Sequence, residues 1–294
     1  FFLEMRGSVC VSPGEMMQGE VPACHLVLPT LFLPALISKV VVFPGMIAGS
    51  IAAIGTIAAV WLGATLAIGK GFCGWFCFLG GWEDGFSRIP GVPLIKTVNP
   101  KWRLFPFAAL FFIVLASAQS LSYPYCEWAC PFKMVTEFNQ VVSVERLVQA
   151  AIFVVLFAGL VVVLPVLMKR RAQCALFCPF GAFQSLAGKV SPFEIKIDPL
   201  KCDKCGKCVN VCPVFALDAG RLEKGGPYDT CDKCGKCVDS CDKKAVFFHI
   251  KGVDAGGKAW LHRLLFLYPA FFLLAMLTGV SIQQVIMRII NLVA

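Results

Sequence analysis

The sequence predicts a polytopic α-helical membrane protein with an inserted, cysteine-rich α+β domain. Two observations carry this prediction. Of the 294 residues, 58% are hydrophobic and only 15% are charged, against roughly 25% charged in ordinary soluble domains. The chain also contains 16 cysteines, and an octapeptide with three of them, CDKCGKCV, occurs twice without change. So many cysteines in a largely apolar chain indicate metal or redox chemistry rather than a disulfide framework.

Four apolar runs are long enough to cross about 30 Å of hydrocarbon as helices. They cover residues 44–68, 104–122, 148–168 and 263–287. Residues 26–43 contain Pro29, Pro34 and Lys39, which favour an interfacial or re-entrant segment over a clean span. The apolar start, Phe1-Phe2-Leu3, resembles the end of an earlier apolar segment, so we expect one more transmembrane helix before Phe1.

Basic residues in the loops predict the orientation. Loop 69–103 carries five lysines and arginines and the third run ends in Lys169-Arg170-Arg171, whereas loop 123–147 carries two basic residues. By the positive-inside rule, loops 69–103 and 169–262 face the cytoplasm, and residues 1–43 and 123–147 face outward. We therefore expect a multi-pass protein of a bacterial-type cytoplasmic membrane. Topology accounts for the formal charge of +9, so no nucleic-acid partner is expected.

The cysteine-rich domain has the spacing of a bacterial ferredoxin. Residues 202–213 and 231–241 each contain C-x2-C-x2-C-x3-C, in which the fourth cysteine ligates the other of two 4Fe–4S clusters. Gly206 and Gly235 permit the tight turns that such a motif requires. The first cluster is assigned to Cys202, Cys205, Cys208 and Cys241. The second cluster is assigned to Cys231, Cys234, Cys237 and Cys212. Structural zinc is the alternative reading of paired C-x2-C motifs.

Two alternating stretches flank these motifs and predict the outer strands of the domain. They are FEIKID at 193–198 and AVFFHI at 245–250. The second motif has Asp242 where the first has Pro213, a change that removes no ligand. We therefore expect a two-cluster ferredoxin domain at 191–258. An outer-face segment at 1–43 and a three-helix membrane domain at 44–190 precede it, and a transmembrane helix at 259–294 follows it.

Three C-x3-C pairs lie outside this domain, at Cys73/Cys77, Cys126/Cys130 and Cys174/Cys178. Pro131 and Pro179 directly follow two of the pairs, and proline suits the first turn of a helix. We expect each proline to begin a helix whose N-terminus faces the thiolates and stabilises anionic charge. Phe78 occupies this position in the first pair. Glu83 and Asp84 follow that pair, and their carboxylates could relay protons to a quinone.

With these motifs in place, the chain resembles the NapH-type membrane polyferredoxins of periplasmic nitrate reductase systems over residues 44–258. NosR-type proteins of nitrous oxide respiration and CcoG-type oxidase-assembly proteins share the same parts. The resemblance implies electron transfer between the quinone pool and a partner on the other face of the membrane. Phe78, the added pair Cys126/Cys130 and a spanning helix after the ferredoxin domain depart from the NapH-type pattern.

Sorting the remaining cysteines by predicted side gives two further sets of four, the number that a cubane cluster needs. The cytoplasmic set is Cys73, Cys77, Cys174 and Cys178, a candidate third cluster. The outer set is Cys10, Cys24, Cys126 and Cys130, a candidate fourth cluster. The alternatives are a Cys10–Cys24 disulfide, a reducible Cys126/Cys130 pair, and redox thiols or a mononuclear metal site on the cytoplasmic set.

The sequence thus predicts a membrane electron-transfer subunit of an oxidoreductase complex rather than a stand-alone enzyme. Electrons would pass between the cytoplasmic ferredoxin face and the quinone pool or an outer-face redox partner. The expected partners are an outer-face cytochrome or reductase and a cytoplasmic electron donor or acceptor. Two alternatives stand beside this reading. One is a CcoG-type role in metallocentre assembly or copper reduction, and the other is a structural membrane anchor of a redox complex.

Overall fold

A computed structural model of the chain describes residues 45–47, 50–52, 54–95, 98–120, 124–133, 144–253, 259–272 and 290. These residues fall into two compact units. One unit combines 62–77 with 184–253 and 259–272, and the other contains the described residues up to 61 together with 78–183. This division differs from the predicted boundary at residue 190. Residues 62–77 fall in the same unit as residues 191–253, which we call the ferredoxin-like segment.

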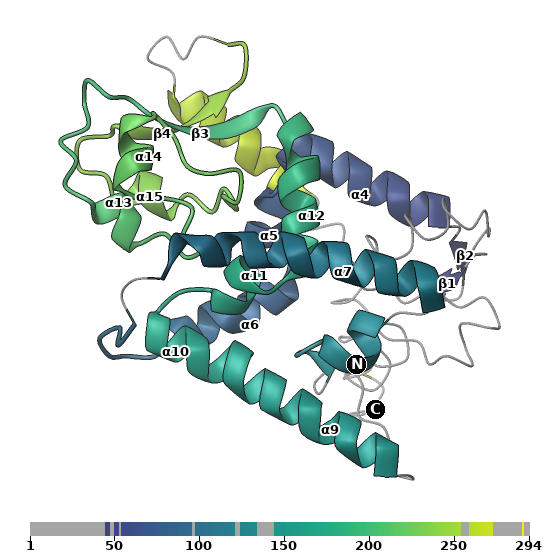
Figure 1. The fold of residues 1–294 in the computed structure, drawn as a ribbon. Coiled ribbons are helices and arrows are strands. Elements are labelled where there is room, and N and C mark those ends of the chain that lie inside the picture. Colours follow the sequence, from purple (N-terminus) through teal and green to yellow (C-terminus); the bar gives the residue numbers. More distant parts are fainter. Residues whose placement is uncertain are drawn as a thin grey trace. The chain divides into compact units, whose positions relative to one another are not determined.

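The ferredoxin-like segment is built on a two-stranded antiparallel sheet. Strand β3, Phe193–Ile197, pairs with β4, Val246–Ile250, in a register that joins Phe193 to Ile250. Along β3 the buried residues alternate with more exposed ones, as a half-buried strand requires. Both predicted outer strands are therefore confirmed. Three short helices follow β3 and precede β4 along the chain. They are α13 (Lys207–Asn210), α14 (Ala219–Glu223) and α15 (Lys236–Asp239) (Figure 1).

A helix over residues 259–272 packs on this sheet within the same unit. Phe266 is fully buried, and its ring centroid lies 4.9 Å from that of Phe248 and 5.4 Å from that of Phe193. Arg263 forms an ion pair with Asp239 of α15 at 2.6 Å. The N-terminal part of the predicted run 263–287 is thus helical, and the rest of that run lies outside the described residues.

The other unit contains a continuous helix over residues 144–168. It comprises α9 (Val144–Leu156), a π-helical stretch η4 (Phe157–Val163) and α10 (Leu164–Met168). Pro165 cannot donate a backbone hydrogen bond to the preceding turn, so wider π-type winding is expected just before it. Among the described residues, only Leu147–Met168 forms a helix long and apolar enough to cross a membrane, and only 22% of its apolar stretch is buried.

Two other predicted spans are helical over shorter lengths. In the run 44–68, β1 (Gly45–Ile47) pairs with β2 (Ser50–Ala52), and α4 begins only at Ile54 and ends at Ile68. The prediction of one helix from residue 44 was therefore wrong at its start, where glycine and serine are weak helix formers. The run 104–122 contains α7, Phe105–Ser120, preceded by the 3₁₀ turn η2, Pro100–Leu104.

A short helix carries the first cysteine of each C-x3-C pair. These helices are α5 (Gly71–Trp75), the π-helical η3 (Tyr125–Ala129) and α11 (Ala172–Leu176). Helix α6, Phe78–Ser87, follows the first pair, and α12, Pro179–Ala187, follows the third. A 3₁₀ turn, η5 (Gly188–Val190), then leads into β3.

Candidate metal centres

The duplication seen in the cysteine motifs extends to the backbone. Three positions in each copy have positive φ, and each pair is separated by the offset of the repeated octapeptide. These pairs are Lys204 and Lys233, Gly206 and Gly235, and Phe215 and Lys244. Gly206 (φ 76°) and Gly235 (φ 83°) precede α13 and α15, which confirms the tight turns predicted for them. Left-handed backbone is costly for side chains with a Cβ, so glycine suits these two corners.

Hydrogen bonds hold the cysteine turns in shape. The carboxylate of Asp203 accepts from the Cys205 N–H at 3.3 Å, and Asp232 accepts from the Cys234 N–H at 3.4 Å. Backbone N–H groups also point at sulfur: Ala216 donates to Cys212 Sγ at 3.2 Å. Such donors favour the thiolate over the thiol, and thiolates are the form that binds iron.

One cavity gathers cysteines from both motifs. Its lining includes Cys202, Cys205 and Cys208 of the first motif and Cys241 of the second. These four residues are the predicted ligands of the first cluster. The donor set, four cysteines around one hollow with two glycine-dependent turns, fits a cubane cluster, which would supply one-electron chemistry when bound.

The second group of cysteines is more deeply buried. Burial raises the pKa of the Cys231, Cys234 and Cys237 thiols, and the neighbouring Cys212 sulfur raises it further. As free thiols these groups would stay protonated at neutral pH. A bound metal reverses this preference, because coordination deprotonates the thiol outright. The nearness of Cys212 to the other three agrees with the predicted ligand set of the second cluster.

A structural zinc site and a cubane cluster make different demands on the same sulfurs. Zinc is held by four ligands that all lie about 2.0–2.3 Å from a single ion, whereas a cubane cluster spreads its four thiolates over four irons. Across the part of the chain that the structure describes, no three histidine, cysteine or acidic side chains converge on a single-ion site.

The first C-x3-C pair lies against the second cysteine turn, within one unit. The indole Nε1 of Trp75 in α5 donates to the Lys233 carbonyl oxygen at 3.2 Å. A Cβ on Gly74 would lie 2.5 Å from the Asp232 carbonyl oxygen, so only glycine permits this approach. In the sequence Gly74 is marked only as a glycine inside the first pair, where the other two pairs have alanine or glutamate. Helix α5 therefore brings Cys73 towards the predicted second cluster.

The third pair has the predicted helix start. Helix α12 begins at Pro179, directly after Cys178, and the Gly181 N–H in its first turn donates to Cys178 Sγ at 3.4 Å. Helix α6 likewise begins at Phe78, directly after Cys77. A helix therefore also starts directly after the first pair, without a proline.

Glu83 accepts a hydrogen bond from the backbone of the third pair. Its carboxylate oxygens accept from the Cys174 N–H at 3.0 and 3.3 Å, and the side chain is fully buried. Burial raises the pKa of Glu83 to about 7, and the hydrogen bond from Cys174 opposes this rise. The adjacent Asp84 pairs with Arg171 at 3.2 Å and with Arg88 at 2.6 Å. Both acids that the sequence analysis noted are thus tied to the segment around Cys174.

The remaining predicted ligands are described less fully. Cys130 is buried and is followed by a turn at Pro131, and the residues that would continue a helix lie outside the described ranges. The Cys126 side chain, Cys10 and Cys24 also lie outside what the structure describes. Cys73 and Cys77 belong to one unit and Cys174 and Cys178 to the other, so their quartet stays a prediction.

Comparison with known families gives matches to two families, each described as a 4Fe-4S binding domain. One matches residues 195–218, in the ferredoxin-like segment. The other matches three times, at residues 51–96, 102–144 and 150–198. Each of the three matches contains one C-x3-C pair, so the pairs are three copies of one family motif.

Several curated proteins are similar to the chain. A putative electron transport protein, YccM, of Escherichia coli is 26% identical over 153 residues, 51% of this chain and 43% of that protein. The ferredoxin-type protein NapH of Haemophilus influenzae is 30% identical over 149 residues, 49% of this chain and 47% of that protein.

The methylamine utilization ferredoxin-type protein MauN of Paracoccus denitrificans is 40% identical over 55 residues, 18% of this chain and 19% of that protein. The chain thus spans less than half the length of each of these three relatives. No solved structure matches the chain.

Proposed function

Because this chain is a homologue of ferredoxin-type proteins and fits the NapH type of polyferredoxin, we propose that it is a membrane iron–sulfur electron-transfer subunit. In this proposal electrons move between a cytoplasmic ferredoxin face and the quinone pool or an outer-face redox partner. The protein is part of a larger respiratory or redox complex. Its own residues hold, space and insulate the clusters, and the clusters supply the redox chemistry.

The observation that carries the proposal is the contact of α5 with the second cysteine turn. Trp75 and Gly74 hold the first C-x3-C pair against residues 232–233. Electron transfer needs closely spaced centres, and this contact provides a short route out of the ferredoxin domain. The two-cluster domain then becomes the cytoplasmic end of a chain of centres. Cys73, Cys77, Cys174 and Cys178 hold the third cluster in this proposal, and Cys10, Cys24, Cys126 and Cys130 hold the fourth.

Exposed apolar side chains support a multi-pass membrane protein. Monomeric soluble proteins rarely expose large contiguous apolar patches. Here large apolar side chains are exposed on four helices that were predicted as spans, each helix taken by itself. They are Leu62 and Leu66 on α4, Phe111 and Phe112 on α7, Val154 and Val155 on α9, and Leu264, Leu265, Phe271 and Phe272 on the helix at 259–272.

The first test is the iron and acid-labile sulfide content of the anaerobically purified chain, with electron paramagnetic resonance of the reduced form. We expect about sixteen irons per chain, four for each cubane cluster. About twelve irons would mean that one of the two clusters proposed at the membrane faces is absent. About eight would leave the C-x3-C pairs without clusters and contradict the proposed transmembrane route. Copper bound to Cys126 and Cys130 in that case would favour the CcoG-type assembly role.

A further inference from the structure

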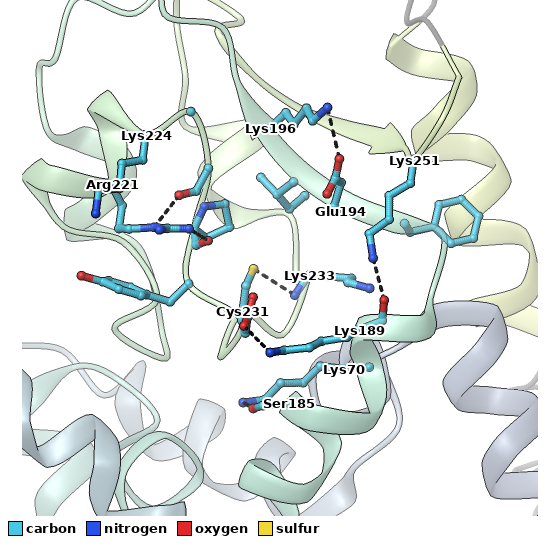
Figure 2. Close-up of a pocket in the computed structure, with 18 residues that line it drawn as sticks. Lys70, Ser185, Lys189, Glu194, Lys196, Arg221, Lys224, Cys231, Lys233 and Lys251 are labelled. Carbon is cyan, nitrogen blue, oxygen red and sulfur yellow. Dashed lines mark hydrogen bonds and ion pairs between the residues drawn. The ribbon is translucent and has the colours of Figure 1, made fainter.

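A cavity of about 310 Å³ lies beside the second cysteine turn, within a single unit (Figure 2). Small-molecule sites have volumes of roughly 300–1,000 Å³, so this cavity is large enough for a small ligand. Its wall comes from several segments: Lys70, the stretch 185–196, the stretch 221–233, and Lys251. None of the cysteine motifs explains a hollow here, because only Cys231 of the predicted ligands lines it.

Positive charge dominates the wall of this cavity. Two lysines are paired with carboxylates, Lys189 with Asp229 at 3.1 Å and Lys196 with Glu194 at 3.3 Å. Glu194 and Asp229 are also the two acidic residues among those that line the cavity. Five further basic side chains line it, and Figure 2 shows them on different sides: Lys70, Arg221, Lys224, Lys233 and Lys251.

Four of these five basic residues donate hydrogen bonds in the structure, and the acceptors given are neutral oxygens. Lys70 Nζ donates to Ser185 Oγ at 2.7 Å, and Lys251 Nζ donates to the Lys189 carbonyl oxygen at 2.7 Å. Arg221 donates from Nε to the Gly226 carbonyl oxygen at 2.9 Å and from a terminal nitrogen to the Pro227 carbonyl oxygen. Carbonyl and hydroxyl groups satisfy the donors but do not neutralise the charge.

Two of these lysines are buried, which makes the excess charge costly. Lys70 is 6% exposed and Lys233 is 8% exposed. Lys233 Nζ donates to Ser191 Oγ at 3.1 Å and to the Ile68 carbonyl oxygen at 3.3 Å. An ammonium group held away from water is costly unless an anion pairs with it. Lys189 and Lys196 already pair with the two carboxylates of the lining, so an anionic ligand would balance the charge of the five further basic residues.

Phosphate is the anion that fits this wall best. Arginine and lysine together are the usual donors to phosphate oxygens, arginine as a planar fork and lysine as a point charge. Phe193, Ile195, Pro227 and Tyr228 add apolar surface to the same cavity. An inorganic ion alone would leave this apolar surface uncovered. We propose that the cavity binds the phosphate group of an organic phosphate ester, either a soluble ester or the headgroup of an anionic phospholipid.

The test is calorimetric titration of the full chain in phosphatidylcholine nanodiscs with glycerol 3-phosphate. Saturable binding is expected. Lys224→Glu and Lys251→Glu each reverse the charge of one exposed wall residue, and each should weaken binding at least tenfold. Lys101→Glu is the matched control, because Lys101 is exposed and does not line the cavity. It should leave binding unchanged. Two wall variants are used so that a folding defect in one does not decide the result.

The source of the phosphate group is distinguished in the same experiment by repeating the titration in nanodiscs that contain phosphatidylglycerol. If these discs block glycerol 3-phosphate binding to the unmodified chain, the occupant is a lipid headgroup. If binding is unchanged, the occupant is a soluble ester. Absence of saturable binding in the phosphatidylcholine discs, or equal weakening by Lys101→Glu, would overturn the proposal. Binding is measured without reference to electron transfer, so this result is independent of the proposed function.

Discussion

Cys241 belongs by sequence to the second cysteine motif, but it lines a cavity with three cysteines of the first. The converse holds for Cys212, whose sulfur raises the pKa of the Cys234 and Cys237 thiols of the second motif. At the scale of single residues, we therefore expect the fourth cysteine of each motif to be exchanged between the two sites.

This exchange predicts which variants share a phenotype. Cys241→Ala should lose the same paramagnetic signal and about the same number of irons as Cys205→Ala, because both would leave the first cluster with three ligands. Cys212→Ala should match Cys234→Ala. The measurement is iron content with electron paramagnetic resonance of each reduced variant. If Cys241→Ala and Cys234→Ala instead lose the same signal, the ligands do not cross between motifs.

Glu83 gives a second prediction at this scale. Glu83→Ala would leave the partly buried Cys174 N–H without its acceptor, which should lower the free energy of unfolding by about 1–3 kcal/mol. Glu83→Gln keeps an acceptor oxygen in place and should cost less. Thermal unfolding of the purified chain in detergent measures both changes.

The matched control for Glu83 is Glu145→Ala, because Glu145 is exposed in the first turn of α9. Its free energy of unfolding should change by less than about 0.5 kcal/mol. Equal stability of Glu83→Ala and Glu145→Ala would show that the hydrogen bond to Cys174 contributes nothing to the fold.

At the scale of elements, the helix at 259–272 is held to the ferredoxin sheet by one aromatic cluster. Phe266 contacts the rings of Phe248 and Phe193, and a Cβ on Gly71 would lie 2.8 Å from the Phe266 ring. The same helix presents Phe271 and Phe272 outward. One face therefore serves packing on the sheet and another carries exposed apolar side chains.

Removing the buried ring should weaken this attachment. Phe266→Ala deletes a fully buried aromatic side chain, and such changes cost about 3–5 kcal/mol. Phe272→Ala is the control on the same helix, because Phe272 is 56% exposed. Chemical unfolding of the detergent-solubilised variants, followed by tryptophan fluorescence, compares the two. A cost for Phe272→Ala as large as that for Phe266→Ala would contradict the assigned packing face.

At the scale of the whole molecule, the prediction concerns which side of the membrane each loop faces. Basic loops predict that 69–103 and 169–262 are cytoplasmic, and Leu147–Met168 is apolar and only 22% buried. In this arrangement the span carries the chain from the outer loop 123–147 to the ferredoxin domain on the cytoplasmic side.

Reporter fusions test this topology. Alkaline phosphatase needs disulfides and so becomes active only outside the cytoplasm. Fused after Lys133 it should be active, and fused after Arg171 it should be inactive. Green fluorescent protein at the same two positions provides the reciprocal control. Phosphatase activity at both positions would show that the segment between them does not cross the membrane.

Much of the ferredoxin segment could be predicted from the sequence, because its signals are local. The spacing of Cys202 to Cys212 recurs at Cys231 to Cys241, alternating residues predict β3 and β4, and Gly206 and Gly235 have the positive φ that their turns require. The helix start at Pro179 is local in the same sense. A fixed spacing or a backbone preference acts over a few residues, so it can be identified without knowledge of the fold.

Other features depended on contacts between distant residues, which only the tertiary structure could decide. The approach of Gly74 to Asp232, the hydrogen bond between Glu83 and Cys174, and the burial of Lys70 and Lys233 join segments far apart in the chain. No local pattern in the sequence marks these partners, because packing of many side chains determines which surfaces meet. The sequence alone thus determined the cysteine motifs, strands β3 and β4, and the approximate positions of the apolar helices. The tertiary structure decided which surfaces adjoin those motifs and where the basic cavity lies.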